Sequence, residues 1–368
     1  MTSIAGFDRR ELQVLGLVGT AHMLSHLYML AWAPLQSPIA RDLGISYTEF
    51  GIALSAFAVT TVIFQTPMCL LVERVGGRLV LIAGLFVNSA SFVLIGLFAQ
   101  EFWMLVGLMA LAGFGNAVFH PADYSLLSSS IDDKRIGKSF SVHTFVGHIG
   151  FILGPIITVA AEPFIGWRGA LISIGMAGLL TTVALIAFAN RITDSANVKK
   201  NRPIRESLHE LLSSPPVLLF FVFYFCTSFA NVGLSQFSVV ALEGMYGITR
   251  GVAVAALTAY QIGALLLILP GGVLADKTTR YDLIILLGFS SVALLVLFIG
   301  TGLFPFWLIV ALLCLAGAIR GVVNTSRDVA VRRIARNIPV GTVFGFVSTG
   351  FLVGQGLGGP FYGWLFDN

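Results

Sequence analysis

Charged side chains are scarce in this sequence. Only 11% of its 368 residues are Asp, Glu, Lys or Arg, whereas 57% are hydrophobic. Soluble domains carry about 25% charged residues, so this chain has too few to cover a surface that faces water. The scarcity excludes an ordinary soluble protein and predicts an all-α polytopic membrane protein, because helices satisfy their own backbone groups inside a bilayer.

Cysteine and enzyme motifs are also scarce. The three cysteines lie far apart in apolar runs, which favours small core residues over a disulfide or a metal site. The sequence has no glycine-rich phosphate loop, no His-Glu-x-x-His motif and no basic face for nucleic acid. We therefore expect no enzymatic activity, no cofactor, no metal, no direct use of ATP and no nucleic-acid partner.

The hydrophobic residues gather into eleven runs, each long enough for the roughly 20 residues that a membrane helix needs. Their approximate limits are 13–38, 48–71, 79–99, 102–127, 139–161, 168–190, 216–241, 251–272, 281–301, 304–326 and 340–365. The first run has no small-residue cleavage site, so we expect a retained helix rather than a signal peptide.

Basic residues indicate the orientation of these runs. Of the 22 Lys and Arg residues, 18 fall in one set of alternate loops, whereas Arg41, Arg168 and Arg250 fall in the other and Arg320 lies within a run. Cytoplasmic loops carry the excess of basic residues. We therefore predict a cytoplasmic N-terminus and a location in the bacterial cytoplasmic (inner) membrane.

A polar, basic segment divides the chain. Residues 191–215 are predicted to form a cytoplasmic linker between a six-helix N-terminal bundle (1–190) and a five-helix C-terminal bundle (216–368). Pieces of the two bundles match at offsets of 203 to 205 residues. The matched pairs are Glu73-Arg74 with Asp276-Lys277, Phe102-Trp103 with Phe306-Trp307, and Gly154-Pro155 with Gly359-Pro360. The bundles are thus predicted to be parallel repeats.

The loop after the second run carries the motif Cys69-x-x-x-Glu73-Arg74-x-Gly76-Gly77-Arg78, and a shorter copy, Gly272-x-x-x-Asp276-Lys277-x-x-Arg280, follows the eighth run. Together with the repeat, this motif resembles the major facilitator superfamily, in which two parallel bundles bind substrate near the midplane between them. Cys69 and Glu73 depart from the usual Gly and Asp. The resemblance implies a cytoplasmic gate motif, with plain basic loops as the alternative. Its members are Glu73, Arg74, Gly76, Arg78, Asp276 and Lys277.

Two shorter patterns refine the resemblance. The stretch Gly147-x-x-Gly150-x-x-x-Gly154-Pro155 is similar to the antiporter motif of drug exporters, although such glycines also allow close helix packing. Ser25-His26-Leu27 and residues 115–122 resemble the fosmidomycin-resistance branch. The superfamily usually has twelve helices. With eleven runs, we expect either a fragment or a twelfth position filled by another element.

Ionisable residues inside the runs are the best indication of function, because a charge in hydrocarbon is costly and usually serves a site. His22 and His26 lie one turn apart, near the midplane of the first run. They are predicted to bind substrate or protons, with hydrogen bonding to a neighbouring helix as the alternative. Tyr28, Asn116 and Asn324 are predicted as uncharged lining of the same translocation path.

His120 and Asp123 lie three residues apart on one helical face, and a carboxylate beside a histidine responds to pH near 7. We predict that these two and His148 couple transport to protons; Asp123 could instead be a polar residue at a helix end. His143 and His148 point about 140° apart on a helix. We therefore expect the deeper His148 to face the site and His143 to pack at the cytoplasmic rim.

Arg320 lies deep in the tenth run, where its permanent charge requires an anion. A substrate carboxylate, phosphate or phosphonate, held by two hydrogen bonds, would supply one. Asp123 as a structural partner is the alternative.

These residues lead us to expect a monomeric secondary transporter that moves a small, anionic organic solute by alternating access, coupled to protons. The alternatives are a proton/drug antiporter that exports a small antimicrobial, a transporter-like receptor and, more remotely, an intramembrane histidine metal enzyme. The sequence leaves open the substrate, the direction of transport and the choice between symport and antiport.

Overall fold

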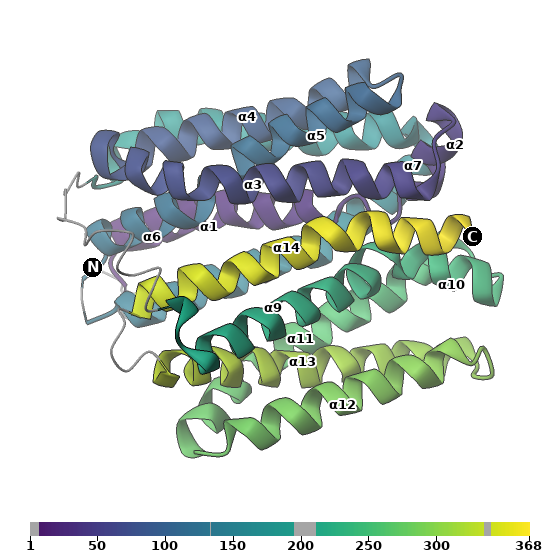
Figure 1. The fold of residues 1–368 in the computed structure, drawn as a ribbon. Coiled ribbons are helices and arrows are strands. Elements are labelled where there is room, and N and C mark those ends of the chain that lie inside the picture. The colour runs from purple at the N-terminus through teal and green to yellow at the C-terminus, as the bar shows by residue number, and fades with distance from the viewer. Residues whose placement is uncertain (1–6, 133, 195–210, 335–339) are drawn as a thin grey trace. The chain divides into compact units, whose positions relative to one another are not determined.

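The computed structural model describes residues 7–132, 134–194, 211–334 and 340–368, and helices account for most of them. Figure 1 shows the chain from the purple N-terminal helices to the yellow α14. The N-terminal helices are α1 (Arg9–Leu30), α2 (Gln36–Leu43), α3 (Tyr47–Val75), α4 (Gly77–Phe98), α5 (Phe102–Asn116), α6 (Phe119–Ser130), α7 (Ile136–Ala187) and the short 3₁₀ helix η1 (Ala189–Arg191). The C-terminal ones are α9 (Pro215–Val232), the π-helical η2 (Gly233–Phe237), α10 (Ser238–Tyr246), α11 (Arg250–Lys277), α12 (Tyr281–Gly300), α13 (Phe306–Ile334) and α14 (Val340–Asp367).

The predicted all-α membrane fold is confirmed. Among the described residues, eight helical segments are long and apolar enough to cross a bilayer, and one of them, α7, has 52 residues. The fifth and sixth runs are both contained in α7, which bends at Gly166, where φ is +67°. Only glycine adopts such a backbone conformation without strain.

Two predicted helices are each divided in the structure. The first run separates into α1 and α2 around a turn at residues 31–35. The fourth separates into α5 and α6 at Ala117 and Val118. Pro121 explains the second break, because its ring clashes with the carbonyl group four residues earlier, that of Ala117. The break therefore lies one turn before the proline. The short helix α6, which carries His120 and Asp123, begins directly after it.

The chain divides into two compact units. Unit 1 contains Met1–Lys200 and Gly359–Asn368, and unit 2 contains Asn201–Gly358. Most of the predicted linker, residues 195–210, lies outside the described residues. The last turns of α14 therefore belong to unit 1 by their contacts, although the helix begins in unit 2.

Glycines bring the helices of each unit into backbone contact. In unit 1, a Cβ atom on Gly175 would lie 2.8 Å from the carbonyl oxygen of Ser89 in α4. In unit 2, a Cβ atom on Gly354 in α14 would lie 2.5 Å from the carbonyl oxygen of Phe225 in α9. These distances are too short for a larger residue, so the glycine-rich composition is explained by helix packing of the kind found in membranes.

The end of α14 caps the start of α3. Asp367 accepts hydrogen bonds from the backbone N–H groups of Tyr47 (2.9 Å) and Thr48 (2.8 Å). Ser46 accepts one from Glu49 in the same turn. The first amide groups of α3, which have no partner inside the helix, are thus satisfied by side chains.

A second polar network joins α1 to the loop before α7. Asp8 and Glu11 form a capping box, and Arg135 donates to the Glu11 carboxylate at 2.8 Å. Burial raises the pKa of Glu11, but the hydrogen bonds from Arg135 and from the backbone of Asp8 and Asp132 outweigh it, so that the pKa is lowered. The stabilisation is therefore present at neutral pH and is lost as the pH falls through this lowered value.

The motif after α3 is held by the segment that follows α7. Asp194 accepts hydrogen bonds from the backbone N–H groups of Gly77 (2.9 Å) and Arg78 (3.1 Å), and so caps α4. The Arg78 guanidinium donates to the carbonyl oxygen of Ala189 at 2.9 Å. Gly76 has a φ of +93°, and a Cβ atom there would collide with the Asp194 carboxylate.

The other predicted gate residues have less defined surroundings. Glu73 is half-buried, and Arg74 and Lys277 are exposed at the ends of their helices. Asp276 lies in α11, but its side chain is not among those described. Their role as a gate stays a prediction.

We predict that Gly76→Ala lowers the free energy of unfolding by about 1–3 kcal/mol, because alanine would hold a backbone conformation that only glycine adopts readily. Thermal unfolding of the detergent-solubilised protein measures this. Gly107→Ala is the matched control, since a Cβ atom at Gly107 meets nothing within 4 Å. Equal stability of the two variants would contradict the explanation.

Candidate functional site

Five histidines gather in unit 1, on α1, α6 and α7. The ring of His22 is the centre of the group. Its centroid lies 4.4 Å from that of His26, 5.5 Å from His120 and 4.0 Å from His143. His148 continues the chain of rings, 6.2 Å from His26. The structure thus brings together histidines from three helices that are far apart in sequence.

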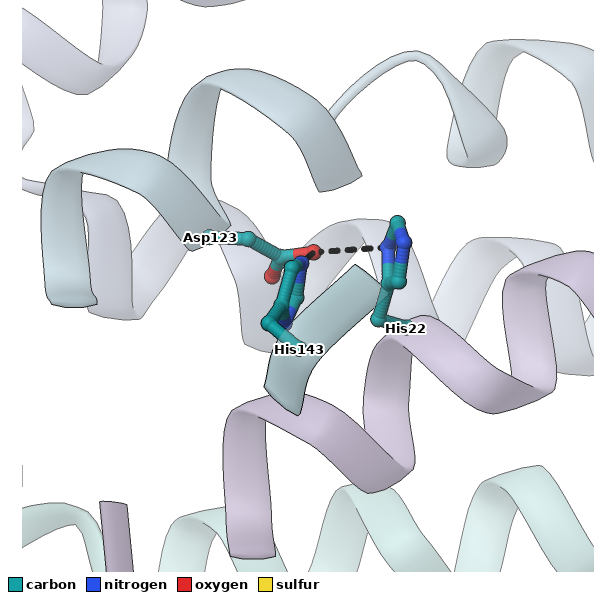
Figure 2. Close-up of side chains that lie close together, drawn as sticks. All are labelled: His22, Asp123 and His143. Atoms are coloured by element: carbon teal, nitrogen blue, oxygen red, sulfur yellow. Dashed lines mark ion pairs between the residues drawn. The ribbon is translucent and has the colours of Figure 1, made fainter. Parts of the chain in front are cut away.

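The Asp123 carboxylate lies close to two of these rings, those of His22 and His143. Its Oδ2 atom is 3.1 Å from Nδ1 of His22 and 3.4 Å from Nε2 of His143. Figure 2 shows the three side chains close together, with a dashed line from Asp123 to His22. The three side chains are enclosed: Asp123 is 0% exposed, His143 2% and His22 4%. A carboxylate sealed in an apolar bundle requires compensation of its charge, and the two imidazoles are the groups placed to give it.

The sequence folds this way because α1 and α7 approach closely. A Cβ atom on Gly147 would collide with the His22 ring, and one on Gly150 would collide with the carbonyl oxygen of Met23. Gly154 similarly faces Leu27. The glycines that resemble an antiporter motif are therefore sufficiently explained by packing, and this packing places His143 against His22.

His143 corrects one prediction from the sequence. We expected it at the rim because it points away from His148 on the helix. The structure instead buries it beside Asp123. Both imidazoles of α7 reach α1, with His143 beside His22 and His148 beside His26. The direction in which each side chain leaves the helix was therefore misleading by itself. Gly147 and Gly150 let α1 pack closely against α7, so that the rings of both His143 and His148 contact side chains of α1.

The remaining histidines are less enclosed than this triad. His26 and His148 are half-buried and His120 is exposed. His26 stacks on Phe151, with ring centroids 4.2 Å apart. Nδ1 of His148 lies 3.0 Å from the carbonyl oxygen of Thr144. A carbonyl oxygen can only accept, so Nδ1 of His148 carries the hydrogen and the Thr144 carbonyl fixes the orientation of the ring.

Two predicted lining residues lie outside this group. Tyr28 is fully buried, and its hydroxyl donates to Ser89 (3.0 Å) and to the carbonyl oxygen of Ile174 (3.1 Å). It is therefore part of the packing among α1, α4 and α7. Asn116 is half-buried at the end of α5, where its Oδ1 accepts from Asn88 at 3.4 Å.

Arg320 belongs to unit 2, where it is half-buried on α13. Its guanidinium carbon lies 5.5 Å from the centroid of the Tyr260 ring. Within the part of the chain that the structure describes, no carboxylate forms an ion pair with it. Asn324 is half-buried one turn further along α13. Asp123, the alternative partner for this arginine, has His22 and His143 as its neighbours.

Unit 2 also contains a feature that the sequence did not reveal. The helix that begins as α9 becomes π-helical at Gly233–Phe237, and such irregular turns often occur at functional sites. Asn231 beside it donates to Ser235 at 3.2 Å, and Tyr260 donates to Asn231 at 3.5 Å. The ring under Arg320 is therefore connected to this turn. In the sequence, the only indication of this π-helical turn was the presence of polar residues in the otherwise apolar run 216–241.

Comparison with known proteins identifies the family. The sequence pattern of the Major Facilitator Superfamily matches residues 18–256 and 235–368. The chain belongs to the major facilitator superfamily. Its relatives are transporters, as the sequence predicted. The crystal structure of a bacterial homologue of the human lysosomal transporter Spinster, inward-facing and unoccupied, shares the fold with a TM-score of 0.81 at 15% identity, covering 98% of this chain and 84% of that one.

Relatives with assigned names match parts of the chain. A probable L-galactonate transporter of Escherichia coli is 30% identical over 39% of this chain and 32% of its own length. The E. coli inner membrane transport protein YajR is 32% identical over 41% of this chain and 33% of its own length. The quinolone resistance protein NorA of Staphylococcus aureus is 24% identical over 55% and 51%. The matches thus span about a third to a half of these relatives.

We predict that Gly150→Ala destabilises unit 1 by about 1–3 kcal/mol, because the added methyl group would force α1 and α7 apart. Thermal unfolding in detergent gives the change. Gly137→Ala on the same helix is the control, since a Cβ atom there meets nothing within 4 Å. A Gly150→Ala variant as stable as this control would show that the close approach is unimportant.

Proposed function

We propose that this protein is a secondary active transporter of a small, anionic organic solute, coupled to protons and located in the bacterial inner membrane with its N-terminus in the cytoplasm. Membership of the superfamily supports transport by alternating access. The observation that carries the choice of an anion is Arg320, a permanent cation on an apolar helix with no carboxylate partner among the described residues. Arginine binds carboxylates with two parallel hydrogen bonds.

The names of two relatives suggest different solutes. L-galactonate, for which one relative is named, is a sugar acid with a carboxylate. Another is named for resistance to quinolones. We favour the carboxylate because it complements Arg320. Export of an antimicrobial by proton exchange is the second candidate, favoured by the Gly147–Gly154 pattern, although packing accounts for those glycines. The fosmidomycin-resistance branch stays a resemblance of two short segments.

Protons are the coupling ion that we propose. His120, Asp123 and His148 were the candidates to carry them. A group that exchanges protons with water must be reached by water, which disfavours the enclosed Asp123 and leaves the exposed His120 and the half-buried His148. Of these two, His148 is the one whose ring continues the row of imidazoles through His26. The Thr144 carbonyl also orients the His148 ring by accepting a hydrogen bond from Nδ1. That ring faces His26 on α1, with His22 one turn away. We assign proton exchange to His148.

We predict that Arg320→Gln weakens binding of L-galactonate at least tenfold and that Arg320→Lys retains part of it, because lysine keeps the charge but lacks the planar fork. The rise in melting temperature of the purified protein with L-galactonate measures binding. Arg333→Gln is the matched control: Arg333 is also on α13 and also lies over a tyrosine ring, 4.7 Å from that of Tyr281. Equal binding by the Arg320→Gln protein would reject the anion site.

We predict that a pH gradient alone drives L-galactonate across inverted membrane vesicles and that a protonophore abolishes this. His148→Gln should keep the binding but lose the response to the gradient, because glutamine cannot gain a proton. Counterflow, which exchanges labelled for unlabelled solute without a gradient, controls for intact transport. Gradient-driven transport by His148→Gln at the wild-type rate would remove this histidine from the mechanism. The sign of the gradient that drives accumulation separates uptake from export.

A further inference from the structure

The triad formed by His22, Asp123 and His143 is more than a neutralised carboxylate. Each residue offers one nitrogen or oxygen atom, and these three atoms lie within 4.8 Å of one another. They come from α1, α6 and α7, so three separate helices converge on one point (Figure 2). The three residues are at most 4% exposed.

The polar atoms of the triad are left without hydrogen-bond partners. Within the described residues, this holds for Nδ1 of His22, both carboxylate oxygens of Asp123 and both ring nitrogens of His143. The contacts at 3.1 and 3.4 Å are close, but they lack hydrogen-bond geometry. Buried polar atoms are nearly always satisfied, and an orphaned one requires an explanation such as a bound ion. One such atom from each of the three residues lies in the group of atoms within 4.8 Å of one another, and this group indicates a missing partner.

We infer that this triad is a binding site for a divalent transition metal of the zinc class. Zinc binds histidine nitrogen and carboxylate oxygen at about 2.0–2.2 Å in tetrahedral geometry, which separates neighbouring ligand atoms by about 3.3 Å. Two of the three separations, 3.1 and 3.4 Å from the Asp123 oxygen, are close to this value, and the third, between the two nitrogen atoms, is at most 4.8 Å. The His22 and His143 rings are stacked, so we expect them to turn slightly for both nitrogen atoms to face one ion. Calcium and magnesium are excluded by the donor set, because they prefer oxygen ligands and here two of the three are imidazoles.

The site differs from the substrate and proton sites proposed above. It uses neither Arg320 nor His148, and metal binding to the purified protein needs no transport. Three protein ligands leave a fourth coordination position for water. The bound ion would join α1, α6 and α7, so it should stabilise unit 1 against unfolding in the manner of any ligand that prefers the folded state.

The test is a titration of chelator-treated, tag-free protein in detergent with Co²⁺, whose visible absorption reports tetrahedral coordination. All proteins carry His209→Gln, which removes the sixth histidine of the sequence. We expect one Co²⁺ per chain, displaced by Zn²⁺ but not by Mg²⁺, and a higher melting temperature with Zn²⁺. Asp123→Asn and His143→Gln should each weaken binding at least tenfold, since even residues that only support metal ligands contribute about 10–100-fold.

A matched control keeps the result specific. Asp282→Asn makes the same chemical change at an exposed position, so it should bind Co²⁺ like the parent protein. The inference is overturned if the parent protein binds no Co²⁺, or if Asp123→Asn and His143→Gln bind it as tightly as this control. The parent measurement needs no variant, so it stands even if a triad variant fails to fold.

Discussion

The arrangement of unit 1 depends on one enclosed carboxylate. Asp123 is completely buried among apolar helices, and a carboxylate in such surroundings is unstable unless opposite charge or donor groups surround it. His22 and His143 are the groups in reach. This requirement explains why α1 and α7 must approach each other and why the facing positions on α7 are glycines.

The two units have different electrostatic characters. Unit 1 gathers imidazoles and a carboxylate, groups whose charge or coordination can change. Unit 2 holds Arg320, whose charge is permanent, beside an aromatic ring and a π-helical turn. In the transporter that we propose, the two units therefore have different roles. Arg320, with its permanent charge, binds the anion, and the imidazoles of unit 1, which can gain or lose a proton, respond to the coupling ion. A superfamily fold supports many solutes, so these side chains rather than the fold decide the chemistry.

Helix ends in unit 1 are satisfied by side chains distant in sequence. Asp194, which follows α7, caps α4, and Asp367, at the end of α14, caps α3. Both carboxylates accept from amide groups that have no partner within their own helix. At the end of α3, Glu73 takes the position of the usual Asp of the superfamily motif, while the cap of α4 comes from Asp194. The glycine at position 76 is required by its positive φ and by the closeness of this cap.

The sequence by itself determined the membrane class, the limits of most helices and the superfamily, and it singled out His22, Asp123 and Arg320 as candidate site residues. These follow from composition, hydrophobic run length and the cost of charge in hydrocarbon, all of which are local properties. Only the tertiary structure decided that His143 belongs beside Asp123, that Tyr28 is part of the packing, and that Arg320 lies over Tyr260. Those facts depend on which helices pack against each other and on the position of each contact along the helix axis. Helical phase predicts a direction for a side chain, but glycines such as Gly147 and Gly150 set how closely a neighbouring helix approaches, and that distance decides which side chains meet.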